Sequence, residues 1–294
     1  MLSYYSDGDA DSGISTTTDS SGQLGQNGSA VNTLRAICFD LDGTLADTEP
    51  LGHRPAYNRA FREAGLGWRW TPKLYRDLLQ HPGGGRDRLR HYMQSYEPEW
   101  PEAMELDTSD PEALIRDLHA RKAQHFHKIV EKGEVPLRPG VERLIGEASA
   151  AGVKLAVVSN ASRGTVASLL AHSLGKTIGG QLDVVLCGDE GYAKKPAPDL
   201  YLEAMRQLGV QPGEAIAVED SRLGLRAALE AGMATVVTLN KITRNEDFSG
   251  ADLVVDSLGE PEAPTTLARP TLLNDGWVTL ADLRAAQQRH AKLA

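Results

Sequence analysis

The chain has 294 residues, of which 41% are hydrophobic and 24% are charged, and its formal net charge is −9. This composition supplies enough apolar side chains for a buried core and excludes general disorder. The negative charge argues against nucleic acid or an anionic membrane as a partner, and no stretch approaches the roughly 20 apolar residues of a membrane span.

The first 33 residues are predicted to form a flexible tail, because they are rich in Ser, Gly, Asp and Thr and contain few large apolar residues. Residues 1–30 contain no Lys or Arg and no apolar segment, so we expect neither a secretory signal nor a transit peptide. Cys38 and Cys187 lie in apolar runs, as reduced core thiols do. We therefore expect a cytoplasmic protein, and we take it to be a monomer.

Residues 34–39 form a short apolar run that ends in a polar loop, as a buried parallel strand does. Further strands of this kind are expected at 153–158, 183–187, 215–218, 234–239 and 252–255. They alternate with expected helices at 140–151, 162–173, 197–208 and 222–231, and a last helix is expected at 279–292. This alternation indicates an α/β fold with a doubly wound parallel sheet.

Between the first and second predicted strands the pattern changes to helical periodicity, with no strong strand signal. Gly- and Pro-rich breaks such as Pro82-Gly83-Gly84-Gly85 separate helices that we expect at 54–64, 73–80, 86–96 and 111–131. The predicted organisation is a flexible tail at 1–33, an α/β core at 34–49 and 136–260, an all-helical cap domain at 50–135, and a C-terminal extension with one helix at 261–294.

Residues 51–96 carry nine basic and three acidic residues, so this segment has a charge of +6 within an acidic protein. A solvated helix surface with long cationic side chains explains this charge. A surface that attracts anions to a site explains it equally well, and the segment alone does not decide between the two.

Two carboxylates, Asp40 and Asp42, directly follow the first predicted strand, and Gly43 permits a tight turn. Like charges this close are costly unless a cation lies between them or one is protonated. Asp-rich turns are common, but a turn alone does not explain why the pair follows a fully apolar strand. Because ligands of parallel sheets bind beyond the carboxyl ends of the strands, the pair predicts a functional site.

Polar residues also follow the next two predicted strands. Ser159 and Asn160, followed by Ala161, open a helix; they either cap it or hold a phosphoryl oxygen with hydroxyl and backbone N–H groups. Lys195 stands before Pro196 at a loop–helix junction. It is either a surface lysine or a cation that faces a phosphoryl group.

Glu219 and Asp220 form a second acidic pair, at the end of the strand expected at 215–218. A helix N-cap is the structural alternative for Asp220. Four acidic groups at one edge of a sheet would repel one another strongly without a metal, and hard oxygen ligands suit Mg²⁺. The sequence therefore predicts a magnesium site at this edge.

In order along the chain, these four loops match the four motifs of the haloacid dehalogenase (HAD) superfamily, which the chain resembles over 34–256. The resemblance implies a HAD-like Rossmannoid core with an inserted helical cap, and a phosphatase rather than a dehalogenase, because Asp42 and Asp220 are present. It implies that Asp40 is the nucleophile that forms an aspartyl-phosphate, and that Asp42 is the acid/base. The other implied roles are phosphoryl binding by Ser159 and Lys195, and Mg²⁺ binding by Asp40, Asp220 and the carbonyl of Asp42, with Glu219 in or next to that shell.

The expected cap narrows the resemblance. Segments 47–54, 78–86 and 118–122 look like those of the CbbY-type phosphatases, closest to the plant-type branch, which remove the 1-phosphate of xylulose 1,5-bisphosphate, an inhibitor of Rubisco. That family usually has Lys at the position of Arg86. Either cation can bind a phosphate, but only Arg does so bidentately. A bisphosphate needs a second anion site, which Arg86, His119 and Lys122 could form, while Glu49 and His53 would contact sugar hydroxyls. The substrate-binding residues implied are Glu49, His53, Gly83, Gly84, Gly85, Arg86, His119, Arg121, Lys122, Asn160 and Ala161.

Two other functions stay open. A sugar-phosphate mutase of the β-phosphoglucomutase type shares the fold and all four motifs, but returns the phosphoryl group to another hydroxyl instead of water. A sugar-phosphate sensor without catalysis is the alternative from another class, and the intact Asp40 and Asp42 argue against it. The expected ligand is a small phosphorylated sugar, with Mg²⁺ as cofactor and no nucleic-acid or membrane partner.

Overall fold

A computed structural model describes residues 33–81, 83–100, 110–173, 178–269, 273 and 275–293. The predicted flexible tail, apart from residue 33, lies outside the described residues, so its conformation stays a prediction. Of the glycine-rich break at 82–85, all but Pro82 is described.

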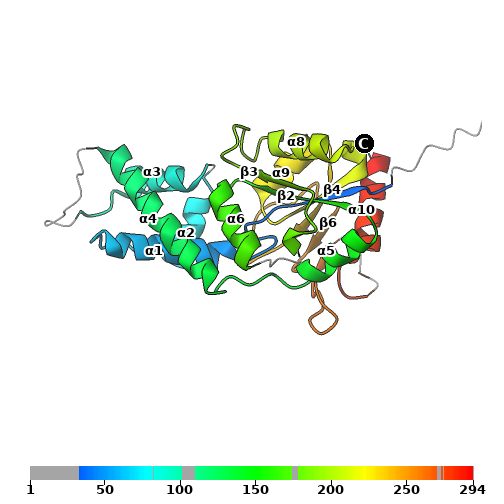
Figure 1. Ribbon diagram of the computed structural model, residues 1–294, viewed down its shortest axis with the longest axis horizontal. Coiled ribbons are helices and arrows are strands. Elements are labelled where there is room, and N and C mark those ends of the chain that lie inside the picture. The colour runs from blue at the N-terminus through cyan, green and yellow to red at the C-terminus, as the bar shows by residue number, and fades with distance from the viewer. Residues whose placement is uncertain are drawn as a thin grey trace, which may run out of the picture. The chain divides into compact units, whose positions relative to one another are not determined.

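The described residues form a seven-stranded sheet in the order β3-β2-β1-β4-β5-β6-β7 (Figure 1). The first six of these strands are parallel, and β7 pairs antiparallel with β6. The strands are β1 (Ala36–Phe39), β2 (Lys154–Ser159), β3 (Val184–Cys187), β4 (Ala215–Glu219), β5 (Ala234–Thr238), β6 (Leu253–Val255) and β7 (Ala268–Arg269). The predicted parallel α/β sheet is therefore confirmed. The first and last residues of each predicted strand lie within two residues of the observed bounds.

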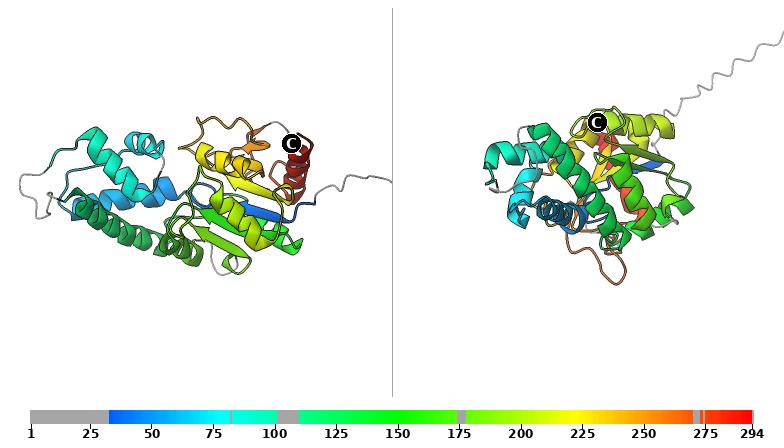
Figure 2. Two further views of the ribbon diagram at one scale, coloured as in Figure 1. Left: turned by 90° about the horizontal axis from the view of Figure 1, so that it is seen from above. Right: turned by 60° about the vertical axis from the view of Figure 1, so that its left-hand side comes forward.

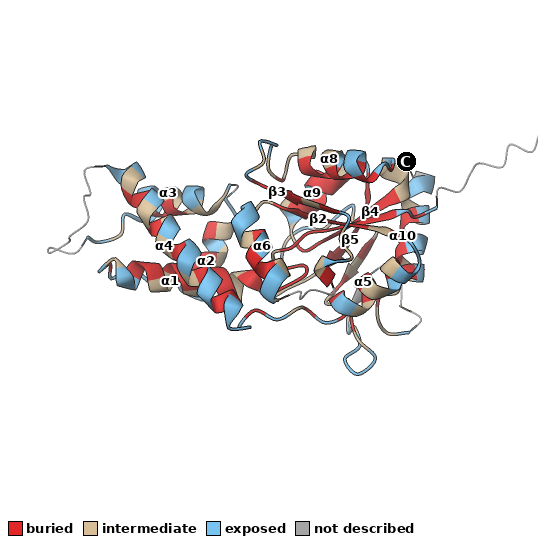
Figure 3. Cartoon of the chain, in the orientation of Figure 1, coloured by how far each residue is buried: buried red, intermediate tan, exposed pale blue. Residues whose placement is uncertain are grey.

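Helices cover both faces of the sheet because the apolar side chains of each strand alternate between them. Ile37 and Phe39 of β1 face a core shared with α5, α6 and α10, whereas Ala36 and Cys38 face a core shared with α8 and α9. The six parallel strands are buried along nearly their whole length (Figure 3). The helices are α5 (Val141–Ala150), α6 (Arg163–His172), α8 (Asp199–Leu208), α9 (Arg222–Glu230) and α10 (Leu280–Leu293), with a 3₁₀ turn, η2 (Pro212–Glu214).

The described residues between β1 and α5 contain helices and no strand, as the sequence predicted. They begin with a π-helical turn, η1 (Glu49–His53), which runs directly into α1 (Arg54–Glu63). The other helices are α2 (Pro72–Leu79), α3 (Gly85–Tyr96) and α4 (Pro111–Glu131). This helical insertion (Figure 2) has its own core, in which half of the buried side chains are aromatic, among them Tyr57, Phe61, Trp70 and Tyr92.

The C-terminal residues add to the sheet domain. The helix predicted at 279–292 is observed as α10, and its Leu280, Leu283 and Ala286 belong to the same apolar core as β5 and β6. The two-residue strand β7 was not predicted, because so short a segment carries no periodicity. Across the described part of the chain, no helix has both the length and the apolar character needed to cross a membrane.

Candidate active site

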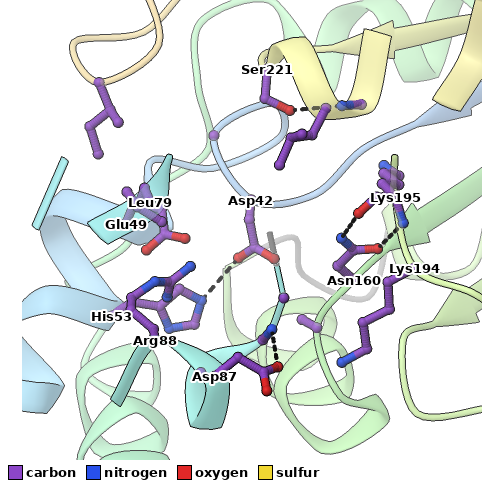
Figure 4. Close-up of a pocket in the computed structure, with 18 of the residues that line it drawn as sticks. Asp42, Glu49, His53, Leu79, Asp87, Arg88, Asn160, Lys194, Lys195 and Ser221 are labelled. Atoms are coloured by element: carbon purple, nitrogen blue, oxygen red, sulfur yellow. Dashed lines mark hydrogen bonds and ion pairs between the residues drawn. The ribbon is translucent and has the colours of Figure 1, made fainter. Parts of the chain in front are cut away.

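The polar residues that follow the strands meet at one edge of the sheet. β1 lies between β2 and β4, and Phe39 is level with Val157 on one side and Val218 on the other. The residues after these strands therefore emerge next to one another, beyond the carboxyl ends of the sheet. A cavity of about 570 Å³ opens there, lined by these loops and by the helical insertion (Figure 4).

Lys195 lies at the floor of the cavity and joins two carboxylates. Its Nζ donates to Oδ1 of Asp40 at 2.8 Å, to Oε1 of Glu219 at 2.6 Å and to the carbonyl of Val158 at 2.7 Å. Although burial opposes its charge, Asp40 and Glu219 raise the pKa of Lys195, so it stays cationic. Glu219 is fully buried and also accepts from the hydroxyl of Tyr201 at 2.6 Å.

Three carboxylates are close enough to hold one divalent cation. Asp40, Glu219 and Asp220 offer oxygens that all lie within 4.8 Å of one another. Burial, reinforced by the charges of Asp40 and Glu219, raises the pKa of Asp220 well above its usual range. Oδ2 of Asp40 is buried and has no hydrogen-bond partner among the described residues. This oxygen-rich, self-repelling set fits a hard dication such as Mg²⁺.

Glu219 has a more specific place than the sequence indicated. Its Oε1 is committed to Lys195 and Tyr201, so it first serves to hold the lysine that faces Asp40. Only Oε2 is left for a cation, and that atom lies 3.3 Å from the backbone N of Asp220. Metal binding by Glu219, and by the carbonyl of Asp42, stays a prediction.

Asp42 is held as a carboxylate by donors from three directions. Oδ1 accepts from Thr48 at 2.6 Å and from Nε2 of His53 at 3.2 Å, and Oδ2 accepts from Ser159 at 3.2 Å. Burial alone would raise its pKa, but the hydrogen bonds from His53 and Thr48 and the charge of Lys122 lower it to about 2. Asp42 therefore points into the cavity as a base (Figure 4).

A buried lysine fixes the tautomer of His53. Nζ of Lys122 donates to Nδ1 of His53 at 2.9 Å, so the ring proton resides on Nε2, where it faces Asp42. The His53 ring stacks on Phe126 at 4.2 Å, which fixes its plane. The contact of His53 with sugar hydroxyls stays a prediction. The structure gives His53 another role, because it orients the carboxylate of Asp42.

The loop after β2 holds Asp42 and the backbone of Lys195 in place. Ser159 is completely buried, and its Oγ accepts from the backbone N–H of Ala161 at 3.0 Å. The amide of Asn160 both donates to the carbonyl of Lys195 at 3.1 Å and accepts from its N–H at 2.9 Å. The Asn160 side chain is therefore used to hold the Lys195 loop, which leaves its backbone as the part available to a substrate.

The glycine loop of the helical insertion forms the opposite side of the cavity. Gly83, Gly84 and Gly85 line it, and a Cβ on Gly85 would lie 2.5 Å from the Tyr57 hydroxyl and 2.9 Å from Nε2 of His119. Glycine is thus required for this close approach. Burial, with smaller contributions from Lys122 and Arg86, lowers the pKa of His119 to about 4, so His119 is neutral near pH 7.

Two arginines of α3 take different places. Arg86 lines the mouth of the cavity and is exposed. Arg88, which was not among the predicted site residues, turns inward: it donates to the Tyr75 hydroxyl at 3.3 Å, and that hydroxyl donates to Glu49 at 2.5 Å. Nε of Arg88 is buried and without a hydrogen-bond partner in the described chain. The two lie about 200° apart around the helix, which is why only one faces inward.

Arg121 does not reach the cavity, which contradicts its predicted role in substrate binding. Its guanidinium pairs with Asp117 at 2.7 Å and with Glu63 at 3.0 Å. It follows His119 and precedes Lys122 on α4, but it is turned by about 100° from Lys122, so it faces away from the site. His119 and Lys122 do line the cavity, and their binding of substrate stays a prediction.

Two further residues, Arg138 and Asn240, hold the loops that carry the acidic residues of the site. The buried Arg138 donates to the carbonyls of Gly43, Thr238, Leu239 and Asp256, so it ties three segments together. Asn240 donates to Oδ2 of Asp220 at 2.5 Å. Gly43 has φ +97°, and a Cβ there would collide with the side chains of Asp220 and Asn240. No local pattern in the sequence marks Arg138 or Asn240, because their partners are distant along the chain.

The fold and this site define a class of protein. The chain matches the family model of haloacid dehalogenase-like hydrolases over residues 34–232. The chain therefore belongs to that family, and it is an enzyme of the phosphatase kind.

Particular relatives are similar over most of the chain. Protein CbbY of Cupriavidus necator is 40% identical over 252 residues, which cover 86% of this chain and 96% of that protein. A CBBY-like protein of Arabidopsis thaliana is 39% identical over 234 residues, covering 79% and 72% of the two chains. The crystal structure of an Asp→Asn variant of Rhodobacter sphaeroides CbbY in complex with xylulose 1,5-bisphosphate has a TM-score of 0.68 at 39% identity, and covers 76% of this chain and 95% of that one.

The ionisation of Lys122 is expected to lower kcat/KM at high pH. Its burial lowers the pKa of Lys122 to about 8, so the free enzyme loses this charge as the pH rises through 8. For an anionic substrate, kcat/KM is expected to fall by about tenfold per pH unit above that value, because it reports ionisations of the free enzyme. Lys122→Arg keeps its charge, so its descending limb is expected at higher pH. Identical limbs in both proteins, measured between pH 6 and 10, would contradict this assignment.

Proposed function

We propose that this enzyme is a Mg²⁺-dependent phosphatase that removes one phosphate from a sugar bisphosphate, with xylulose 1,5-bisphosphate as the first candidate. One observation carries the proposal: a single cavity has two separate sets of anion-binding groups. Lys195 lies at the sheet edge, together with the acidic cluster that would bind a phosphate through a bound cation, and the glycine loop lies opposite with Arg86, Arg88, His119 and Lys122. The CbbY structure that binds xylulose 1,5-bisphosphate supports this choice of substrate.

The proposed reaction has two steps on Asp40. In the first, an Asp40 oxygen attacks phosphorus, the bond from phosphorus to the sugar oxygen breaks, and Asp42 gives its proton to that oxygen. In the second, water attacks the aspartyl-phosphate, Asp42 takes a proton from the water, and the bond to Asp40 breaks, which releases inorganic phosphate. When bound, Mg²⁺ supplies positive charge that offsets the repulsion between the phosphate and the carboxylates.

Asp42 must carry a proton for the first step, although its pKa is about 2 in the free protein. A phosphate dianion that enters the cavity brings a like charge close to Asp42 and raises that pKa. His53 and Thr48 hold the carboxylate in one orientation during both steps. Lys195 keeps the charge of Asp40 compensated by its bond of 2.8 Å.

A phosphate-release assay tests the proposal. Xylulose 1,5-bisphosphate and fructose 1,6-bisphosphate are compared with the corresponding monophosphates in excess Mg²⁺. We expect one phosphate per bisphosphate and a kcat/KM about tenfold or more above that of the monophosphate, because the second phosphate adds charge-assisted contacts. Equal turnover of monophosphates would overturn the bisphosphate assignment. An isomer formed without phosphate release indicates a mutase, and tight binding without turnover indicates a sensor.

A further inference from the structure

The residue before the catalytic lysine reaches the opposite side of the cavity. Lys194 is half-buried and lines the cavity, and its Nζ lies beside the glycine loop: a Cβ on Gly84 would be only 3.2 Å from it. Figure 4 shows the Lys194 side chain leaving the same loop as Lys195 and running toward the Asp87 side of the cavity. Two adjacent residues of one loop therefore send their amino groups to different ends of the site.

The charge of Lys194 has no obvious structural use. Among the residues in the described ranges, its Nζ has no hydrogen bond within 3.5 Å and no ion pair within 4.0 Å, and its charge acts on Asp87 only from a longer distance, as the smallest of the causes that lower the pKa of that carboxyl. The nearby carboxylate of Asp87 is already engaged, since it accepts from the backbone N–H of Gly84 at 2.8 Å and from Arg90 at 2.8 Å. An amino group held in a cavity without a protein partner is suited to an anionic ligand.

Other groups at this end of the cavity are also suited to an anion. Arg86 lines it from α3, and His119 lines it from α4. The glycine loop allows both Lys194 and His119 to approach its backbone, because a side chain at Gly84 or Gly85 would occupy the space they use. The sheet domain and the helical insertion thus both contribute to one anion-binding end.

We infer that Lys194 is a specificity-determining residue that binds the phosphate not transferred, from the side of the sheet domain. This inference rests on the proposed bisphosphate function and deepens it. Lys195 serves the reacting phosphate and Lys194 the distant one, and Asn160 fixes the loop that carries both with its two bonds to the Lys195 backbone. The distance between the two amino groups then selects substrates whose two phosphates are separated by a matching distance. A monophosphate can contact only one of the two amino groups.

The test compares two substrates in three variants of the full chain. Lys194→Met removes the charge at nearly constant length, Lys194→Arg keeps it, and Lys241→Met removes an exposed charge that does not line the cavity. The readout is the ratio of kcat/KM for xylulose 1,5-bisphosphate to that for p-nitrophenyl phosphate, which has one phosphate. We expect Lys194→Met to lower this ratio by about tenfold, mainly through KM, and the other two variants to keep it within about threefold.

The outcomes separate this inference from the function on which it rests. If the wild-type enzyme prefers the bisphosphate and Lys194→Met keeps that preference, Lys194 does not bind the second phosphate and the inference is wrong. An equal loss on both substrates also overturns it, because Lys194 would then act through Lys195. If the wild-type enzyme shows no preference for bisphosphates, the proposed function itself fails.

Discussion

Replacement of Asp40 by asparagine is expected to lower kcat by about 10³-fold or more, because an amide cannot form the acyl phosphate on which the proposed reaction depends. The same change removes the ion pair of 2.8 Å between Lys195 and Asp40. The fold should survive, since asparagine has nearly the same volume and the change removes one of three mutually repelling carboxylates. Phosphate release gives the rate, and thermal unfolding shows whether the protein is folded.

A matched control separates the chemistry from the loss of one negative charge. Asp77→Asn changes an exposed carboxylate of α2 that lies outside the main cavity, and it should leave the rate within about twofold. The wild-type protein should in addition be trapped as a phosphorylated species that Asp40→Asn does not form. Turnover by Asp40→Asn within tenfold of the wild-type rate would remove Asp40 from the role of nucleophile.

Removal of divalent cations is expected to reduce turnover to background, and excess Mg²⁺ should restore it. Without a cation the carboxylates of Asp40, Glu219 and Asp220 repel one another, and nothing offsets their repulsion of a phosphate. Because Mg²⁺ would bind the native state alone, it should also stabilise the fold, by about 2.7 kcal/mol at a concentration 100 times the dissociation constant. The measurements are phosphate release and the unfolding temperature, each with and without chelator.

The unfolding measurement locates the cation independently of activity. Asp220→Asn removes one carboxylate of the cluster and should abolish most of the stabilisation by Mg²⁺. Asp247→Asn, an exposed residue outside the cluster, should respond to Mg²⁺ as the wild-type protein does. A rate unaffected by chelation, or equal stabilisation of both variants, would show that this cluster does not hold a catalytic metal.

The sheet edge of the site could be predicted because its residues are tied to strand ends. A continuous apolar run marks each parallel strand, and the polar residues that follow it must emerge at the carboxyl edge of the sheet. Asp40, Asp42, Lys195 and Asp220 were found in this way, and all four line the cavity. The prediction of these site residues did not require the order of the strands in the sheet, since every parallel strand ends at the same edge.

The insertion side was predicted less well, because the spacing of residues on a helix fixes their angles relative to one another but not the direction of the helix as a whole. Arg86 and Arg88 lie on opposite sides of α3, and only packing against the insertion core decides which one turns inward. The same argument applies to α4, where Lys122 faces the site and Arg121 pairs with Glu63 and Asp117.

The fold class, the helical insertion and the acidic pairs at the strand ends are visible in the chain alone, because those features follow from local periodicity and composition. The cooperation of distant residues becomes visible only in the folded protein. Lys122 reaches His53 across 69 positions, and Arg138 donates to the carbonyl of Asp256 across 118 positions. Contacts of this kind leave no pattern along the chain, because they arise only when the packed core brings the elements together.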